Sequence, residues 1–229
     1  QHNSTWEKII NFTELEKTPI PLSKTTFPQG EIEKKLLKWG NKKIVGVDEV
    51  GRGTLAGPLV SAAVSLDEEF FLEKNNLFRD SKTLSINQKN NAFKNILSKS
   101  NFGIGISTAK EIDEKGIIYC TKKSMYQAIQ NLNINPDFII IDAVKLELLK
   151  IPNISLIKGD QRCLSVAAAS IVAKISRDRM MKDIYEKIFP NYGFASNKGY
   201  GSKKHIESLN NLGPSKIHRM SFKPLSKIG

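Results

Sequence analysis

Apolar residues in this chain gather in short runs, and such runs are typical of buried β-strands. Between them lie longer stretches in which apolar residues recur every three or four positions, a pattern that predicts helices. Strands that alternate with helices after a first hairpin indicate an α/β protein. The predicted strands cover residues 44–47, 59–66, 102–107, 138–141 and 154–157, and the predicted helices cover residues 31–39, 86–98, 117–132, 165–181 and 203–211. For the helix at 117–132, the expected buried stripe is Ile117, Ile118, Met125, Ile129 and Leu132.

The pattern also divides the chain into three parts. Residues 1–40 are predicted to form an N-terminal extension. Residues 1–30 are polar and interrupted by Pro19, Pro21 and Pro28, which predicts a loosely attached arm, and residues 31–39 are predicted to form a short helix. Residues 41–190 hold the alternating strands and helices and are predicted to form one α/β domain. Residues 191–229 are predicted to form a small helical part at the C-terminal end.

The charge balance points to a polyanionic partner. The 229 residues include 35 Lys and Arg against 23 Asp and Glu, which gives a formal net charge of +12. A domain this basic usually binds a polyanion, most often a nucleic acid. A basic protein with a merely solvated surface remains the alternative.

The sequence favours a soluble protein of the cytoplasm. No apolar run approaches the roughly 18 residues of a membrane span, and the first residues lack a secretory signal pattern. The two cysteines, Cys120 and Cys163, show no metal-binding spacing. They are therefore expected to be reduced, structural thiols in a reducing compartment.

Three of the predicted strands each lead into a carboxylate. Asp48 and Glu49 follow the run at 44–47, Asp142 follows the run at 138–141, and Asp160 comes shortly after the run at 154–157. Four carboxylates that converge would repel one another unless a cation neutralised them. Oxygen ligands favour Mg²⁺ or Mn²⁺ over zinc. The alternative is that some of these acids are helix caps or surface ion pairs, which applies most to Asp160.

A basic protein with carboxylate-held divalent ions suggests phosphodiester chemistry. Two ions about 4 Å apart can activate a water and stabilise the leaving oxygen of an in-line displacement. Lysine and arginine side chains would then hold the nucleic-acid backbone. The alternatives are a non-catalytic basic module that binds nucleic acid and a structural protein, although the latter leaves the acids at the strand ends unexplained.

Residues 48–53 together with 55–58 resemble the signature of the bacterial ribonuclease HII family, the type 2 ribonucleases H. Other segments resemble further motifs of that family and occur in the family's order, so the resemblance covers about residues 43–225. These segments are residues 80–82 with Leu84, 141–142, 158–160, 168–171 with 173–174, 177–178, 198–200, and 218–219 with 221–222.

The resemblance implies a fold and a site. The fold is a ribonuclease H-like mixed central sheet flanked by helices, with 41–190 as the catalytic domain and 191–229 as a substrate-binding part. The resemblance makes Asp48, Glu49, Asp142 and Asp160 the catalytic metal ligands, with Asp48 bridging two Mg²⁺ or Mn²⁺ ions. It also implies a set of substrate-binding residues. In this set the turn at 51–53 reads the 2′-hydroxyl, and the aromatic side chain of Tyr200 packs on the RNA–DNA junction. This set is Gly51, Arg52, Gly53, Ser81, Lys82, Lys174, Arg177, Tyr200 and Ser202.

Two positions depart from the family pattern. Asn197 stands where a histidine often precedes Lys-Gly-Tyr, and Ser202 stands where a threonine often follows. Ser202 still offers a hydroxyl for a backbone contact. Asn197 cannot titrate, so no acid–base role is assigned to it.

The implied activity is endonucleolytic cleavage of the RNA strand in RNA–DNA hybrids, leaving 5′-phosphates, and incision on the 5′ side of single ribonucleotides in duplex DNA. Such an enzyme serves ribonucleotide excision repair and primer removal. The type 3 ribonuclease H, which prefers long hybrids, is the alternative; the turn at 51–53 together with Tyr200 argues against it. We expect a monomer, and the C-terminal tail shows no convincing motif for binding a replication clamp.

Overall fold

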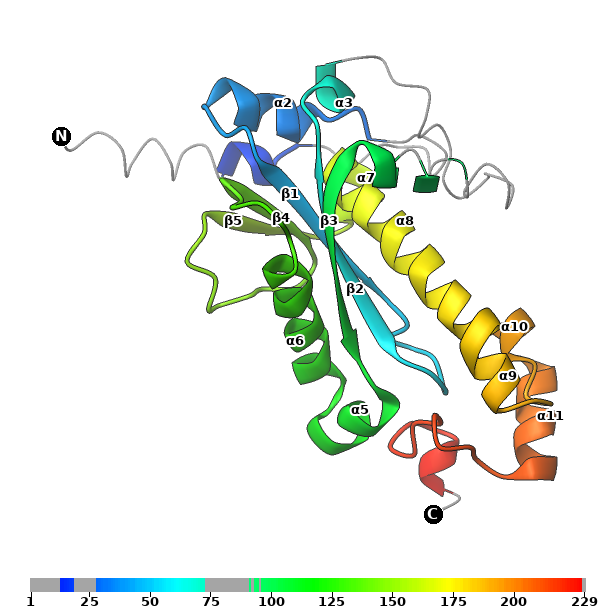
Figure 1. Cartoon of the computed structure of the whole chain (residues 1–229). Coiled ribbons are helices and arrows are strands. Elements are labelled where there is room, and N and C mark those ends of the chain that lie inside the picture. The colour runs from blue at the N-terminus through cyan, green and yellow to red at the C-terminus, as the bar shows by residue number, and fades with distance from the viewer. Residues whose placement is uncertain (1–12, 19–27, 73–90, 92, 95, 228–229) are drawn as a thin grey trace. The chain divides into compact units, whose positions relative to one another are not determined.

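The computed structural model describes residues 13–18, 28–72, 91, 93–94 and 96–227 (Figure 1). Most of the predicted helix at 86–98 lies outside these residues, and so do the predicted substrate contacts Ser81 and Lys82. Within the described part of the chain, no helix is both long and apolar enough to cross a membrane.

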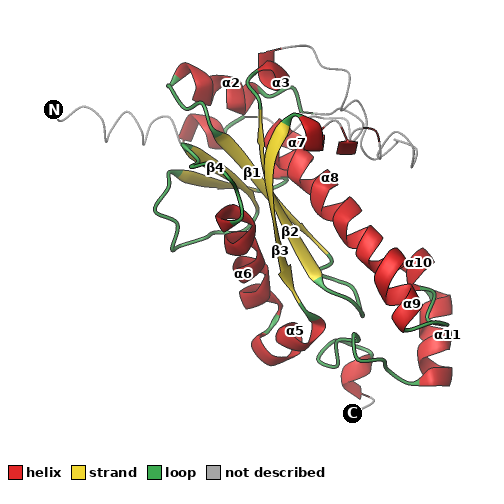
Figure 2. Cartoon of the chain, in the orientation of Figure 1, coloured by secondary structure: helices red, strands yellow, loops and turns green. Residues whose placement is uncertain are grey.

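A five-stranded sheet runs through the fold in the order β3-β2-β1-β4-β5 (Figure 2). β1 pairs with β4, and β4 with β5, in parallel. Residues 51–58, which join β1 to β2, are too few for a crossover, so these two strands are antiparallel and the sheet is mixed. The strands are β1 (Ile44–Val50), β2 (Leu59–Leu66), β3 (Ser100–Ser107), β4 (Phe138–Asp142) and β5 (Asn153–Leu156). All five predicted strands are confirmed.

The helices agree with most of the predicted ones. Where the sequence predicts one helix at 165–181, the structure has α8 followed by a π-helical turn, η2, and the short helix α9. The helices are α2 (Glu31–Lys38), α3 (Glu69–Leu72), α5 (Ala109–Lys115), α6 (Ile117–Gln130), α7 (Gly159–Arg162), α8 (Leu164–Arg179), η2 (Met180–Tyr185), α9 (Glu186–Ile188), α10 (Phe194–Asn197), α11 (Lys203–Leu212) and the 3₁₀ turn η3 (Leu225–Lys227).

The expected buried stripe of α6 is partly wrong. Met125 and Ile129 are buried, but Ile118 is 67% exposed. Ile118 lies in the first turn of the helix, and the buried face begins only at Cys120. Small side chains that the apolar pattern overlooks, such as Ser124, complete that face.

The fold comprises two compact units, each built from separate stretches of sequence. The first unit contains the described residues within Gln1–Asp48, Ala63–Phe102 and Leu132–Ile171, and the second contains those within Glu49–Ala62, Gly103–Asn131 and Val172–Gly229. The predicted boundaries at residues 40 and 190 stay a prediction.

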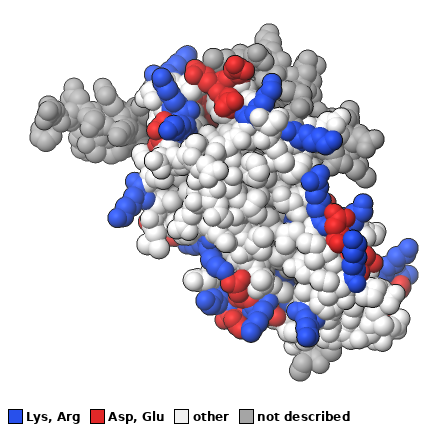
Figure 3. All heavy atoms as spheres, viewed as in Figure 1, with Lys and Arg blue, Asp and Glu red and all other residues white. Residues whose placement is uncertain are grey.

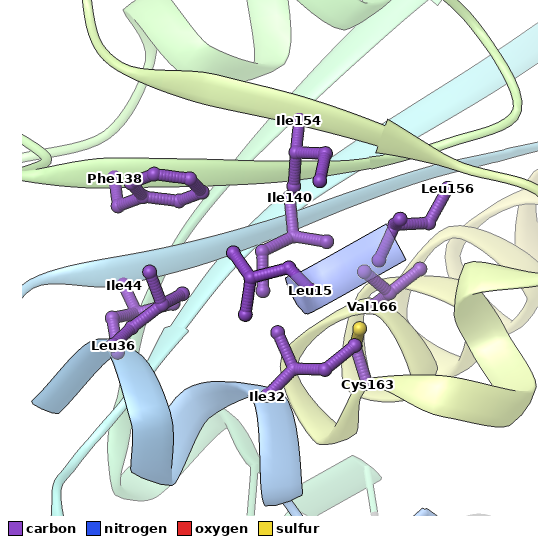
Figure 4. Close-up of a cluster of buried hydrophobic side chains, with 10 residues drawn as sticks. All are labelled: Leu15, Ile32, Leu36, Ile44, Phe138, Ile140, Ile154, Leu156, Cys163 and Val166. Atoms are coloured by element: carbon purple, nitrogen blue, oxygen red, sulfur yellow. The ribbon is translucent and has the colours of Figure 1, made fainter. Parts of the chain in front are cut away.

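The core of the first unit joins the N-terminal region to the sheet. Leu15, Ile32 and Leu36 are almost fully buried and pack in one cluster with Ile44 and Phe138 (Figure 4). Burying each such side chain stabilises the fold by about 1.5–3 kcal/mol. The predicted loose attachment of residues 1–30 therefore does not hold for residues 13–18, whose Leu15 is part of this core, whereas α2 confirms the short helix predicted at 31–39.

Gly46 brings β1 into backbone contact with the start of α8. A Cβ atom on Gly46 would lie 2.1 Å from the carbonyl carbon of Ser165. No side chain fits in that space, so the strand can lie directly against the helix. Because Asp48 follows two residues later, this contact fixes the end of β1 relative to α8.

The second unit has several small apolar clusters. In one of them Ala56, from the loop at 51–58, packs with Met181 of η2 and with Tyr192 and Phe194. In another, Leu55 of the same loop packs with Leu209 of α11. The loop between β1 and β2 is thus anchored on both sides by residues from the C-terminal half of the chain.

Both cysteines are free and buried, Cys120 in α6 and Cys163 between α7 and α8. Burial raises the pKa of both thiols. Both side chains belong to apolar core clusters, which fits the predicted structural role.

Candidate active site

Asp48 and Asp142 lie on neighbouring parallel strands of the first unit. Val47 of β1 is in register with Ile141 of β4, so each acid is the next residue after a registered pair. Side chains at registered positions of adjacent strands point to the same face of a sheet. Asp48 is only 6% exposed. The register therefore places the two carboxylates side by side at the same end of β1 and β4.

Asp142 is tied to the helix that carries Asp160. The backbone N–H of Gly159, the first residue of α7, donates to Oδ1 of Asp142 at 2.6 Å. A Cβ on Gly159 would lie 3.3 Å from that oxygen, which leaves little room for any other residue. Asp160 is the next residue, so α7 begins against the carboxylate of Asp142.

Two residues with left-handed backbone flank these acids. Ala143, directly after Asp142, has a φ of 50°, and Lys158, two residues before Asp160, has a φ of 56°. Such a conformation costs a residue other than glycine about 1–3 kcal/mol and is concentrated at functional sites. Lys158, not Asp160, is the N-cap of α7. The alternative that Asp160 is a helix cap is therefore wrong.

Glu49 follows Asp48 in β1 but belongs to the second unit. Its Oε1 lies 3.3 Å from Nη1 of Arg52 in the adjoining turn. The carboxylate oxygens of Asp48, Glu49, Asp142 and Asp160 are the donors that Mg²⁺ and Mn²⁺ prefer. Among the described residues, no three His, Cys, Asp or Glu side chains are arranged to hold a metal ion together. The shared ion site thus stays a prediction.

The turn at Gly51–Gly53 has the backbone freedom that the sequence predicts. Gly51 has a φ of +92°, and a Cβ there would lie 2.4 Å from Nε of Arg177. Gly53, in contrast, faces open space, with nothing within 4 Å of a Cβ. Arg52, between them, is exposed. One glycine is thus required by close packing, and the other leaves the backbone of the turn accessible.

Arg177 is a predicted phosphate contact whose role the structure corrects. Its side chain is completely buried in the second unit. The guanidinium donates to backbone carbonyls on two loops and to a hydroxyl, and burial lowers its pKa. The acceptors are Pro58 O at 2.8 Å, Ala56 O at 3.0 Å, Thr54 Oγ1 at 2.9 Å and Lys198 O at 2.7 Å. With its donors engaged inside the protein, Arg177 holds the two loops together instead of binding substrate.

Tyr200 and Lys174 lie at the surface of the second unit. Tyr200 is 44% exposed, which does not fit a core tyrosine. Nζ of Lys174 lies 5.9 Å from the centre of the Tyr200 ring and 2.8 Å from Oδ1 of Asp178. Both predicted substrate-binding residues are thus accessible.

The departures from the family pattern have structural roles. Oδ1 of Asn197 accepts from the backbone N–H of Gly199 at 2.7 Å, and its Nδ2 donates to Tyr192 O at 2.7 Å. Asn197 therefore shapes the turn before Tyr200. Ser202 is the N-cap of α11, and its hydroxyl accepts from the backbone N–H of His205 at 3.3 Å.

Arg219 and the pair His205 and His218 are residues to which sequence reasoning gave no role. Arg219 is fully buried and donates to Gly57 O at 2.9 Å and to Arg52 O at 3.0 Å. The available sequence signal for Arg219 was its position beside His218 in the closing motif. The acceptors could not be identified from sequence because they are backbone carbonyls more than 160 residues away.

Comparison with known proteins gives consistent results. The family model of ribonuclease HII matches residues 45–225. The ribonuclease HII of Ligilactobacillus salivarius is 49% identical over 199 residues, covering 86% of this chain and 76% of that protein. The ribonuclease HII of Bacillus anthracis is 42% identical over 226 residues, covering 98% of this chain and 84% of that protein.

Solved structures show the same fold. The ribonuclease H2 of Pyrococcus horikoshii OT3 superposes with a TM-score of 0.66 at 27% identity, covering 81% of this chain and 96% of that one. A chain of the PCNA:RNase HII complex of Archaeoglobus fulgidus superposes with a TM-score of 0.68 at 25% identity, covering 79% of this chain and 95% of that one. Because the family model covers most of the sequence and its relatives are more than 40% identical, the chain belongs to the ribonuclease HII family and is a ribonuclease H.

Proposed function

We propose that this ribonuclease H is a divalent-metal-dependent endonuclease that also incises duplex DNA on the 5′ side of a single embedded ribonucleotide. The observation that carries the proposal is that Asp48 and Asp142 each directly follow the registered pair Val47 and Ile141, with Gly159 hydrogen-bonded to Asp142 just before Asp160. Neighbouring carboxylates can hold divalent ions, and a strongly basic chain attracts nucleic acid. Together these features support hydrolysis of a phosphodiester by this member of the family.

In this proposal Asp48, Glu49, Asp142 and Asp160 would hold Mg²⁺ or Mn²⁺, with Asp48 as the central ligand. When bound, such ions supply positive charge to the attacking water and to the leaving oxygen. The chain's own contribution is orientation: Gly159 fixes the Asp142 carboxylate, and Arg52 lies against that of Glu49. The Bst-RNase HIII structure in complex with Mn²⁺ shares the fold, with a TM-score of 0.60 at 19% identity.

The ribonucleotide is read, in this proposal, by the turn at Gly51–Gly53 and by Tyr200. The exposed backbone at Gly53 can approach a 2′-hydroxyl, which distinguishes RNA from DNA. The exposed ring of Tyr200 can pack against the sugar at the RNA–DNA junction. The two loops are joined directly, because the backbone N–H of Leu55 donates to Gly199 O at 2.8 Å. This connection favours reading of a single ribonucleotide over the long-hybrid preference of the type 3 enzymes.

The remaining substrate contacts are electrostatic. Lys174 lies over the Tyr200 ring, and Ser81, Lys82 and Ser202 complete the proposed backbone contacts. Figure 3 shows basic side chains spread over the visible face, many with acidic side chains beside them. The net charge of +12 therefore acts as a general attraction for the duplex. We assign the protein to ribonucleotide repair and primer removal in the cytoplasm, acting as a monomer.

The decisive experiment uses a labelled DNA duplex with one embedded ribonucleotide and an all-DNA control, each in Mg²⁺ and in chelator. We expect a Mg²⁺-dependent nick on the 5′ side of the ribonucleotide that is absent from the control. Cleavage of a long hybrid without that nick would indicate the type 3 activity. Binding without cleavage of either substrate would indicate a non-catalytic module.

A further inference from the structure

Arg162 connects the active-site helix α7 to a segment that precedes the family match. Its Nη2 donates to Leu15 O at 3.2 Å, Glu16 O at 2.7 Å and Thr18 O at 2.8 Å. Leu15 and Glu16 are the last residues of the helical turn at 13–16 and Thr18 follows it, and backbone carbonyls at such an end need partners outside the helix. Arg162 is 9% exposed, so these charge-assisted hydrogen bonds form in a largely water-free setting.

Glu33 of α2 makes a second connection, to the start of α8. Its Oε1 accepts from the backbone N–H of Ser165 at 2.9 Å and from the Ser165 hydroxyl at 2.8 Å. Glu33 is completely buried. Burial raises the pKa of its carboxyl, and the hydrogen bonds from Ser165 oppose that rise. A carboxyl group at the first turn of a helix satisfies one of the N–H groups that the helix leaves open.

The two connections enclose the stretch that follows Asp160. Arg162 is the last residue of α7, and Ser165 is the second residue of α8. Between them Cys163 is buried against Leu15 and Ile32 (Figure 4). Residues 13–18 and α2 therefore contact this stretch at three places: the hydrogen-bonded Arg162, the apolar Cys163, and Ser165, which is bonded to the buried Glu33.

The orientation of a helix as short as α7 depends on its contacts with the rest of the protein. One turn of helix fixes several backbone angles for a single hydrogen bond, so it is unstable without outside contacts. The first residue of α7, Gly159, is held by Asp142, and the last, Arg162, by the N-terminal segment. Asp160 lies between these two anchors and takes its direction from both.

We propose that Arg162 and Glu33 are positioning residues of the active site, which fix Asp160 by linking α7 and the start of α8 to residues 13–18 and to α2. The proposal rests on the proposed role of Asp160 as a metal ligand, and it gives a function to a segment outside the family match at 45–225. Residues that orient a metal ligand typically change metal affinity 10–100-fold when altered. A segment that only stabilises the fold would instead change the free energy of unfolding and leave the metal requirement alone.

The test compares Arg162→Met with Leu36→Ala. Leu36→Ala removes apolar contact from the same core cluster without touching α7, so it controls for lost stability. Unfolding in urea gives the stability of each variant, and cleavage of the single-ribonucleotide duplex over a Mn²⁺ titration gives the metal requirement. We expect Arg162→Met to raise the Mn²⁺ concentration for half-maximal cleavage about tenfold or more, and Leu36→Ala to leave it within about twofold.

A readout without catalysis is the Mn²⁺-induced rise in melting temperature. It should shift to higher Mn²⁺ concentration in Arg162→Met and not in Leu36→Ala. Should Arg162→Met not fold, Arg162→Lys, which keeps one charged donor, takes its place with the same expected direction.

Two substitutions of Glu33 test the second connection. Glu33→Gln keeps an oxygen that accepts from Ser165 and should retain the wild-type metal requirement, whereas Glu33→Leu should raise it. Equal metal requirements in Arg162→Met and Leu36→Ala at matched stability would overturn the proposal. A wild-type protein without metal-dependent cleavage would overturn the proposed function instead.

Discussion

The imidazole rings of His205 and His218 face each other inside the second unit, with their Nε2 atoms 3.0 Å apart. Nδ1 of His205 lies 2.8 Å from Tyr200 O, so it carries the proton, and its Nε2 is an acceptor. Nε2 of His218 then donates to His205, while Nδ1 of His218 accepts from the backbone N–H of Ser215 at 2.9 Å. This assignment satisfies every contact and leaves both histidines neutral. The pair thus connects the closing motif of the chain to the backbone of Tyr200.

Acid should destabilise the protein through this pair. Burial, and next the neighbouring His205, lower the pKa of His218 from 6.5 to about 4. As the pH falls below 6.5, the unfolded chain therefore takes up a proton before the folded chain does. The free energy of unfolding should fall from pH 6.5 towards pH 4, by up to about 1.4 kcal/mol per pH unit for one proton.

Urea unfolding at a series of pH values between 7 and 4.5 measures this effect. His218→Asn should lower stability at pH 7, because the ring contacts and the hydrogen bond to His205 are lost. It should also flatten the dependence on pH. An unchanged slope in the variant would show that other groups cause the acid sensitivity.

The strands and the acids at their ends could be predicted because their signals are local. A run of apolar residues followed by a carboxylate shows where a strand ends, and the parallel pairing of β1 with β4 then brings Asp48 beside Asp142. The roles of Arg162 and Arg177 depend on hydrogen bonds to distant backbone carbonyls. Every residue has such a carbonyl, so the sequence does not reveal these contacts. A basic residue on a helix looks the same whether it binds a phosphate or a buried loop. The role of residues 13–18 was missed for the same reason.

Arg177→Lys should weaken both the fold and the reading of a ribonucleotide. A lysine cannot reproduce the planar set of bonds to Pro58 O, Thr54 Oγ1 and Lys198 O, so only the backbone bonds to Gly199 O would still join the loop at 51–58 to the Tyr200 loop. Breaking a buried set of charged hydrogen bonds costs about 3–5 kcal/mol. Urea unfolding and the ratio of single-ribonucleotide to long-hybrid cleavage are the measurements.

The control for this change is Arg179→Lys, an exposed position near the end of the same helix. It should alter neither quantity appreciably. If Arg177→Lys instead kept its stability and lost only substrate affinity, this result would support the phosphate contact that the sequence predicts.

Gly46→Ala should be severely destabilising. The added methyl carbon would lie 2.1 Å from the backbone of Ser165, and a backbone cannot move aside as a flexible side chain can. We expect a loss of at least about 3 kcal/mol, at the upper end for overpacking. Gly53→Ala is the matched control, because its Cβ meets nothing within 4 Å and its melting temperature should stay close to that of the wild type. A Gly46→Ala protein of normal stability would show that β1 and α8 are farther apart than in this structure.

Tyr200→Ala should reduce single-ribonucleotide incision far more than stability. The ring is 44% exposed, so its removal uncovers little core. The control is Tyr119→Ala, which removes a ring of similar exposure, 52%, from α6. Incision rates and melting temperatures of both variants decide the matter. Parallel losses of rate and stability in Tyr200→Ala would mean that the ring supports the fold and not the substrate.

Asp48→Asn should abolish cleavage and leave substrate binding nearly intact. The substitution keeps the shape of the side chain and removes the charge that a bridging ligand supplies, while the proposed phosphate contacts, such as Lys174, lie elsewhere. Asp67→Asn, at an exposed position, makes the same change in net charge and controls for the altered attraction of the duplex. Binding is measured in Ca²⁺ or chelator, and cleavage in Mg²⁺. A variant that kept more than about a tenth of the wild-type rate would have lost less than about 1.4 kcal/mol of transition-state stabilisation, too little for the central ligand of the site.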